Sequence, residues 1–98
     1  MACRPKGVEA ARQALTEGAL LLDVRSPAEF RSRHVGSAIN LPASSLGKRF
    51  SELGPKTQPA VVYCRSGARS SRAAKVLRAR GFEQVFDLGA MSNYAPAQ

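Results

Sequence analysis

The chain has 98 residues, which is enough for one small domain with its own core and too few for two. Apolar residues make up 44% and charged residues 22%, a globular composition that argues against disorder. The 15 Lys and Arg against 7 Asp and Glu give a formal net charge of +8, which favours anionic ligands or acidic partners. The basic residues are spread along the chain without a continuous run, so we expect no specific binding of nucleic acid.

Cysteine content and hydropathy bear on the compartment. The two cysteines, Cys3 and Cys64, are too few for a disulfide framework. The first residues contain no apolar segment typical of a secretory signal. No apolar stretch approaches the ~18–20 residues that cross a membrane. We therefore expect a cytoplasmic protein with reduced thiols, no membrane partner and a monomeric state.

Predicted helices and strands alternate along the chain. In chain order, they are a helix over residues 8–15, a strand over 19–24, a short helix opened by SPAEF at 26–30, a strand over 38–42, a weaker helix over 44–53, a strand over 60–64, a helix over 69–80 and a strand over 82–88. The end after the last strand is short and polar, and we expect residues from about 1 to 6 and from about 92 to 98 to fray. The alternation predicts a single α/β domain with a mainly parallel sheet.

Two helices carry clear boundary signals. Ser26 is expected to cap the short helix, with Pro27 in its first position and Glu29 completing a capping box. Gly81 is expected to end the helix over residues 69–80. The apolar face of that helix is predicted to consist of Ala73, Val76, Leu77 and Arg80.

The cysteine at the end of VVYC is the main candidate for chemistry. Cys64 ends a predicted buried strand, and the loop RSGARS leads directly into a helix. Sites in open parallel sheets form at the carboxyl ends of strands, where loop N–H groups and a helix N-terminus converge. Gly67 allows a tight turn, while Arg65 and Arg69 add positive charge. The next acidic residue in the sequence is Glu83, so no neighbouring carboxylate in the sequence opposes that charge.

We expect this environment to favour the thiolate of Cys64. A free cysteine has a pKa of about 8.5 and is mostly protonated at neutral pH. Flanking arginines and a helix N-terminus lower that pKa. The same cradle would hold a persulfide, a thiophosphate or a bound oxyanion. The alternative is a buried core thiol followed by an ordinary turn, but the flanking arginines favour a functional cysteine.

Four blocks of the sequence resemble the rhodanese (sulfurtransferase) family. They are LLDVRSPAEF at residues 21–30, HVGSAINLP at 34–42, VVYCRSGARS at 61–70 and GFEQVFDL at 81–88. Their order and spacing match over nearly the whole chain. The resemblance implies a rhodanese-like three-layer α/β/α domain with a central, mainly parallel sheet. It also implies transfer of a sulfane sulfur from thiosulfate or a related donor to cyanide, a protein thiol or a sulfur carrier, without a cofactor or metal.

The resemblance assigns roles within the loop. Cys64 would be the nucleophile that carries the persulfide, and Arg69 would also bind the anionic donor. The residues that cradle the persulfide would be Arg65, Ser66, Gly67, Ala68 and Arg69. The stretch from Cys64 to Arg69 has six residues, the length found in sulfurtransferases. Phosphatases and arsenate reductases of related fold have a seventh residue, and phosphatases usually carry a histidine where Tyr63 stands here.

Four other residues have more ordinary interpretations. Asp23 and Arg25 could organise the loop from behind, but a structural ion pair or turn is the favoured interpretation. His34, the only histidine, is expected to stabilise a turn, because the reaction needs no acid or base. Cys3 is more simply an incidental thiol than a resolving cysteine.

The C-terminal end departs from the family pattern. Ala90 stands where a second glycine is usual, and Tyr94 lies near a usual tryptophan. Two rival functions remain open at this point. One is a non-enzymatic persulfide carrier that delivers sulfur to a protein partner, and the other is a cysteine-dependent phosphatase.

Overall fold

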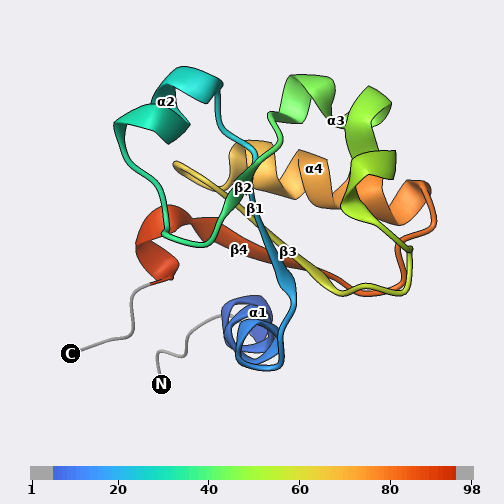
Figure 1. Cartoon of the computed structure of the whole chain (residues 1–98). Helices are drawn as coiled ribbons and strands as arrows, with labels where there is room; N and C mark the ends of the chain where they lie inside the picture. The colour runs from blue at the N-terminus through green and yellow to red at the C-terminus, as the bar shows by residue number, and fades with distance from the viewer. Residues whose placement is uncertain (1–5, 95–98) are drawn as a thin grey trace.

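A parallel sheet of four strands in the order β2-β1-β3-β4 forms the centre of the molecule (Figure 1). The computed structural model describes residues 6–94. The strands are β1 (Leu20–Asp23), β2 (Ile39–Asn40), β3 (Ala60–Cys64) and β4 (Val85–Ala90). The helices are α1 (Lys6–Thr16), α2 (Pro27–Ser32), α3 (Ala43–Arg49), η1 (Phe50–Leu53), α4 (Ala68–Ala79) and η2 (Met91–Asn93). The predicted α/β class with a parallel sheet is therefore confirmed.

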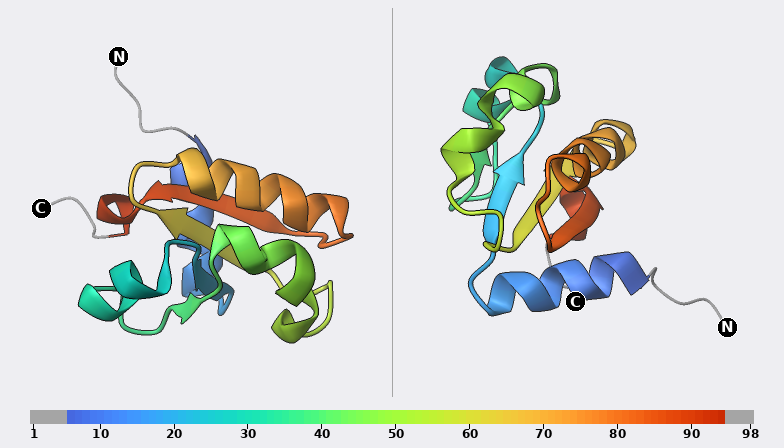
Figure 2. Two further views of the ribbon diagram at one scale, coloured as in Figure 1. Left: turned by 90° about the horizontal axis from the view of Figure 1, so that it is seen from above. Right: turned by 90° about the vertical axis from the view of Figure 1, so that its right-hand side faces the viewer.

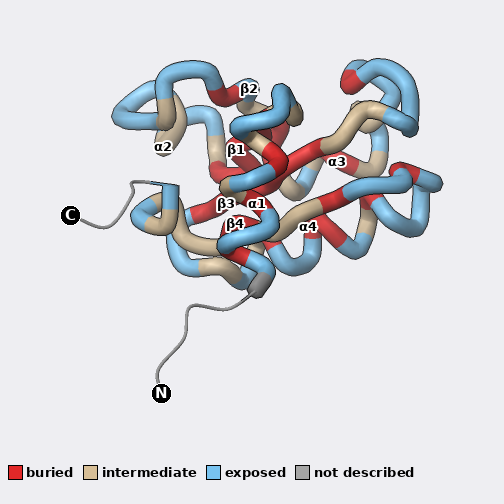
Figure 3. The backbone as a smooth tube through the Cα atoms, turned by 90° about the horizontal axis from the view of Figure 1, so that it is seen from below, coloured by how far each residue is buried: buried red, intermediate tan, exposed pale blue. Residues whose placement is uncertain are grey.

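Helices cover both faces of the sheet. Figure 2 shows α1 on one face, with α3 and α4 on the other. On the α1 side, Val8, Ala11 and Ala14 pack against Val61 and Tyr63. The opposite side holds a larger cluster, whose buried members include Leu22, Leu41, Leu46, Val62, Ala73, Ala74, Leu77 and Phe82. Burial on both faces explains why β1 and β3 are continuous apolar runs, and the buried segments in Figure 3 follow these strands.

β3 fixes the position of the loop that follows it. All five residues of β3 are completely inaccessible to solvent, and the strand lies between β1 and β4. Its predicted boundaries, residues 60–64, are confirmed. Every backbone group in a strand of this kind must be paired inside the sheet. The carboxyl end of β3, where Cys64 stands, is consequently among the most constrained points of the fold.

Boundary signals near α2 and α4 were predicted correctly. The Ser26 hydroxyl accepts a hydrogen bond from the Glu29 N–H at 3.2 Å, and the Glu29 carboxylate accepts one from the Ser26 N–H at 3.0 Å. Gly81 adopts φ 97°, a left-handed conformation that terminates α4. The predicted apolar face of α4 was partly wrong. Ala73, Leu77 and the partly buried Val76 pack on the core as predicted, whereas Arg80 is exposed, and the face also includes the buried Ser70 and Ala74.

The C-terminal end differs from the predicted strand boundaries. The last strand begins at Val85 rather than residue 82 and continues to Ala90, and η2 follows it directly. The Asn93 side chain donates to the Leu88 carbonyl at 2.9 Å, and the Asn93 carbonyl accepts from Arg12 Nε at 3.0 Å. These bonds tie η2 to β4 and α1. Fraying of the two ends of the chain stays a prediction.

A buried carboxylate connects β1 to three other segments. Asp23 accepts a hydrogen bond from the Tyr63 hydroxyl at 2.7 Å and forms an ion pair with Arg25, also at 2.7 Å. The Tyr63 hydroxyl in turn accepts from the Val35 N–H at 3.1 Å. Asn40 on β2 donates to the carbonyl oxygens of Asp23 and Arg25. The favoured interpretation of Asp23 and Arg25 as a structural ion pair agrees with this geometry.

Replacing Tyr63 with phenylalanine is expected to lower the free energy of unfolding by about 1–3 kcal/mol. The change removes the hydroxyl that donates to the buried Asp23 carboxylate and accepts from the Val35 N–H. Urea denaturation measures the difference. The matched control is Tyr94→Phe at an exposed tyrosine, which should stay within about 0.5 kcal/mol of the parent. Equal stabilities for Y63F and the parent would contradict the structural role of this hydroxyl.

Candidate active site

Cys64 is a free thiol at the carboxyl end of β3, where the chain turns into the loop before α4. Its Sγ accepts a hydrogen bond from the Gly67 N–H at 2.8 Å. The residue as a whole is inaccessible to solvent. The sulfur therefore lies at the base of the loop with a backbone donor directed at it, as expected for an anion cradle.

Gly67 makes the turn possible. It adopts φ 104°, which lies in the left-handed region that side chains with a Cβ rarely occupy. This conformation directs the Gly67 N–H at Cys64 and starts α4 at the next residue, Ala68. No side chain caps α4, and the Ser70 N–H in its first turn bonds to the Cys64 sulfur instead.

Hydrogen bonds decide the ionisation of the thiol. Burial raises the pKa of Cys64, but hydrogen bonds from the Ser70 side chain and from the N–H groups of Ser70, Gly67 and Ser66 outweigh it, so the pKa is lowered. The expected direction agrees with this result, and the N–H groups of Gly67 and Ser70 belong to the helix N-terminus that was expected to contribute. The hydrogen bond from the Ser70 side chain is an additional contribution that was not expected.

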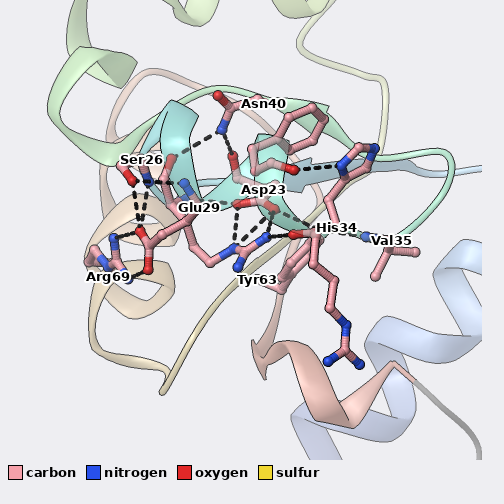
Figure 4. A network of polar contacts seen from close by, with 11 residues as sticks. Asp23, Ser26, Glu29, His34, Val35, Asn40, Tyr63 and Arg69 are labelled. Carbon is pink, nitrogen blue, oxygen red and sulfur yellow. Dashed lines mark hydrogen bonds and ion pairs between the residues drawn. The ribbon is translucent and has the colours of Figure 1, made fainter.

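Arg69 does not face the loop as an unpaired cation. Its two terminal nitrogens donate to the two carboxylate oxygens of Glu29 at 2.7 and 3.1 Å. No carboxylate lies near Cys64 in the sequence, but the fold brings in Glu29 from α2, which opposes the charge of Arg69. Figure 4 shows Glu29 between Ser26 and Arg69. The hydrogen bonds of Arg69 and of the Ser26 N–H lower the pKa of Glu29 to about 2.

Arg69 nevertheless acts on the sulfur electrostatically. Its pKa is raised mainly by the hydrogen bonds to Glu29, and the negative charge of Cys64 adds to that rise. A guanidinium has five N–H donors, and the two bonds to Glu29 leave the others available. Arg69 can consequently stay paired and still contribute donors to an anion above the loop.

Two clefts flank the loop. Arg69 lines one of about 270 Å³ together with Ser26, Pro27 and Ser44. Arg65 is exposed and lines the other, which has a volume of about 350 Å³. The two arginines that were expected to act together in one cradle therefore point to different sides of the loop.

Asp23 and Arg25 form their ion pair behind the site. They lie one strand away from Cys64, and the Asp23 carboxylate contacts Tyr63, the residue before the cysteine. Arg25 is buried, and its pKa is raised mainly by its hydrogen bond to Asp23. Burial raises the pKa of Tyr63 to about 12, so its hydroxyl remains a donor throughout the ordinary pH range.

Ser70 is the residue near the sulfur that the sequence analysis missed. It is completely buried, and its hydroxyl oxygen lies 3.1 Å from the Gly67 carbonyl, so its single proton is donated either to that carbonyl or to the Cys64 thiolate. A signal was present, because Ser70 continues the buried spacing of Ala73, Ala74 and Leu77 by one turn toward the loop. A lone polar residue on the buried face of a helix, one turn beyond a cysteine loop, needs a polar partner.

The predicted role of His34 can be compared with the structure, but that of Cys3 cannot. His34 stacks on the Phe30 ring with centroids 3.7 Å apart and bonds to the Phe30 carbonyl, in agreement with a role in stabilising the turn after α2. Cys3 lies outside the described residues.

Within residues 6–94, no group of three His, Cys, Asp or Glu side chains is arranged to hold a metal ion. No helix in the same range is long and apolar enough to cross a membrane.

The fold and the site together define a class of protein. It has a parallel sheet between layers of helices and a cysteine whose sulfur accepts backbone hydrogen bonds from the loop that follows it. A family profile described as the rhodanese-like domain matches residues 7–95. The chain therefore belongs to the rhodanese-like domain family, which confirms the resemblance seen in the sequence.

Individual relatives agree with this assignment. A protein of Allochromatium vinosum named sulfurtransferase is 43% identical over 77 residues, covering 79% of this chain and 71% of the relative. Thiosulfate sulfurtransferase GlpE of Pseudomonas syringae pv. syringae is 38% identical over 77 residues, covering 78% and 72%. A solved structure described as a rhodanese with anions from E. coli has a TM-score of 0.75 at 28% identity, covering 82% of this chain and 95% of that one.

Replacing Ser70 with alanine is expected to raise the pKa of Cys64, because the change removes a hydrogen bond that stabilises the thiolate. The pH dependence of alkylation by iodoacetamide, followed by mass spectrometry, measures this pKa. Ser71→Ala provides the control, since Ser71 is exposed on the neighbouring position of α4. An unchanged alkylation profile in S70A would remove Ser70 from the stabilisation of the thiolate.

Proposed function

We propose that this protein is a sulfurtransferase that moves a sulfane sulfur from thiosulfate, or a related donor, to a thiophilic acceptor through a persulfide on Cys64. The observation that carries the proposal is the thiol at the end of β3, whose pKa is lowered by hydrogen bonds from the loop and from Ser70. Membership of the rhodanese-like family and the names of the relatives support it.

The first half-reaction would load the cysteine. The Cys64 thiolate attacks the outer sulfur of thiosulfate, a new S–S bond forms, and the S–S bond of the donor breaks with its electron pair leaving on sulfite. No proton is needed for the leaving group. The N–H groups of Ser66 and Gly67 would stabilise the negative charge that remains on the persulfide.

The second half-reaction would release the sulfur. Cyanide or a thiolate attacks the outer sulfur of the persulfide, the S–S bond to Cys64 breaks, and its electron pair returns to the cysteine as a thiolate. The stretch of six residues from Cys64 to Arg69 supports sulfur transfer over phosphate chemistry, because related phosphatases have a seventh residue that widens the loop. We propose the same loop residues for this step as for loading.

Incubation with thiosulfate is expected to add the mass of one sulfur atom to the protein at Cys64, and cyanide should then remove it. Intact mass spectrometry measures both steps, with Cys64→Ser as the variant that should gain no mass and transfer no sulfur. Loading with very slow turnover would favour a persulfide carrier. Hydrolysis of an aryl phosphate that depends on Cys64 would favour a phosphatase, and transfer by C64S at the parent rate would refute the mechanism.

Neutralising Arg69 is expected to lower kcat/KM for thiosulfate by about 10-fold to 100-fold, because we propose that its free N–H donors bind the sulfonate of the donor. Steady-state transfer to cyanide measures the effect in Arg69→Gln. The control is Arg72→Gln, which removes an equal charge from an exposed position of α4. Equal losses in both variants would indicate a general effect of charge instead of donor binding.

A further inference from the structure

The cleft on the Arg65 side of the loop is lined by basic residues that have no role in the proposed loading reaction. It measures about 350 Å³ and is lined by Arg25, Arg33, His34, Val35, Arg65, Met91, Ser92 and Tyr94. Three arginines and the single histidine thus meet in one hollow, and none of the described residues that line it is acidic. Such a concentration of one charge attracts an anion.

Two of these cations are unpaired within residues 6–94. Arg25 is neutralised by Asp23. By contrast, Arg33 and Arg65 are exposed and form no ion pair among the residues that the structure describes. Guanidinium groups bind carboxylates through paired, charge-assisted hydrogen bonds. Arg33 and Arg65 are therefore the groups available to a ligand in the cleft.

The wall that carries Arg33 is fixed to the interior. The Arg33 carbonyl accepts a hydrogen bond from Arg25, and the Val35 N–H donates to the buried Tyr63 hydroxyl at 3.1 Å. His34, between them, stacks on Phe30. Figure 4 shows His34 and Val35 beside Tyr63, on the side of the network opposite Arg69. Because these contacts hold the backbone, a ligand would meet a preformed site rather than order a free loop.

The cleft borders the loop that follows the cysteine. Arg65, the residue directly after Cys64, forms part of its lining, although Cys64 itself does not. A molecule that spans the cleft and the mouth of the loop could thus place one end near the persulfide. Val35 and Met91 give the same hollow an apolar surface suited to a short carbon chain. Thiosulfate has no carbon and little volume, so this cleft fits the donor poorly.

We propose that this cleft is the acceptor subsite, and that it selects small thiols bearing carboxylates. This inference rests on the proposed sulfur transfer. Arg33 and Arg65 bind the carboxylates while the thiolate of the acceptor attacks the outer sulfur of the Cys64 persulfide. The new S–S bond forms on the acceptor, the bond to Cys64 breaks, and its electron pair returns to the Cys64 thiolate. The acceptor leaves as a persulfide.

The test uses a single turnover, so that donor and acceptor steps are separated. Protein loaded with thiosulfate and freed of excess donor is mixed with mercaptosuccinate, which carries two carboxylates, or with the neutral thioglycerol. The measured quantity is the ratio of the two second-order rate constants for loss of the persulfide. Because both thiols face the same sulfur, this ratio cancels effects of a variant on the reactivity of the persulfide.

The ratio is expected to fall about 10-fold in Arg33→Gln, to remain within about threefold of the parent in Arg33→Lys, and to remain unchanged in Arg31→Gln. Arg31 is exposed on α2 and does not line the cleft, so it controls for net charge. An unchanged ratio in R33Q, or an equal fall in R31Q, would overturn the proposal.

A second measurement keeps the two proposals separate. Failure to load sulfur would refute the sulfurtransferase proposal, and the cleft would then be tested by titrating mercaptosuccinate into unloaded protein. Saturable shifts of the Val35 and Arg65 amide signals in NMR spectra are expected, with affinity about 10-fold weaker in R33Q. The absence of such shifts would overturn the acceptor subsite whatever the loading experiment gives.

Discussion

The buried carboxylate of Asp23 is the interaction on which the arrangement of the site depends. An ionised carboxylate without partners would be too costly to bury, so the fold surrounds it with Arg25 and the Tyr63 hydroxyl. Those two partners reach further, to the Arg33 carbonyl and the Val35 N–H. One buried group thereby fixes the end of β1, the end of β3 and the segment after α2 relative to one another.

This arrangement divides the two tasks of the site between different structures. Hydrogen bonds at short range, from Ser70 and the N–H groups of the loop, hold the thiolate of Cys64. Guanidinium groups at its two sides line separate clefts, with Arg69 in one and Arg65 in the other. The donors that bond to the sulfur are neutral, while Arg69 interacts with its charge from a greater distance. The lowered pKa of Cys64 therefore comes mainly from hydrogen bonds, although the chain is strongly basic.

Local signals predicted the fold well, and long-range pairings were not predicted. Two local features could be predicted because they depend only on residues close in sequence. They are the apolar run that ends at Cys64 and the capping box of Ser26 and Glu29. The pairing of Arg69 with Glu29 joins residues forty positions apart, and only the tertiary fold brings the two side chains together. The shared position of Arg33 and Arg65 on one cleft arises in the same way, because two distant loops meet there.

Glu29 Oε1 shows how tightly the first helix after β1 is coupled to the loop. That single oxygen accepts hydrogen bonds from the Ser26 N–H, the Ser26 hydroxyl and Arg69 Nη1. It serves as a helix cap and as a counter-ion at the same time. An anion that draws Arg69 away would change the charge balance at the start of α2, whose Pro27 lines the same cleft as Arg69. Substitutions at Glu29 would alter both roles together, and a double-mutant cycle through Ser26 and Arg69 is needed to divide them.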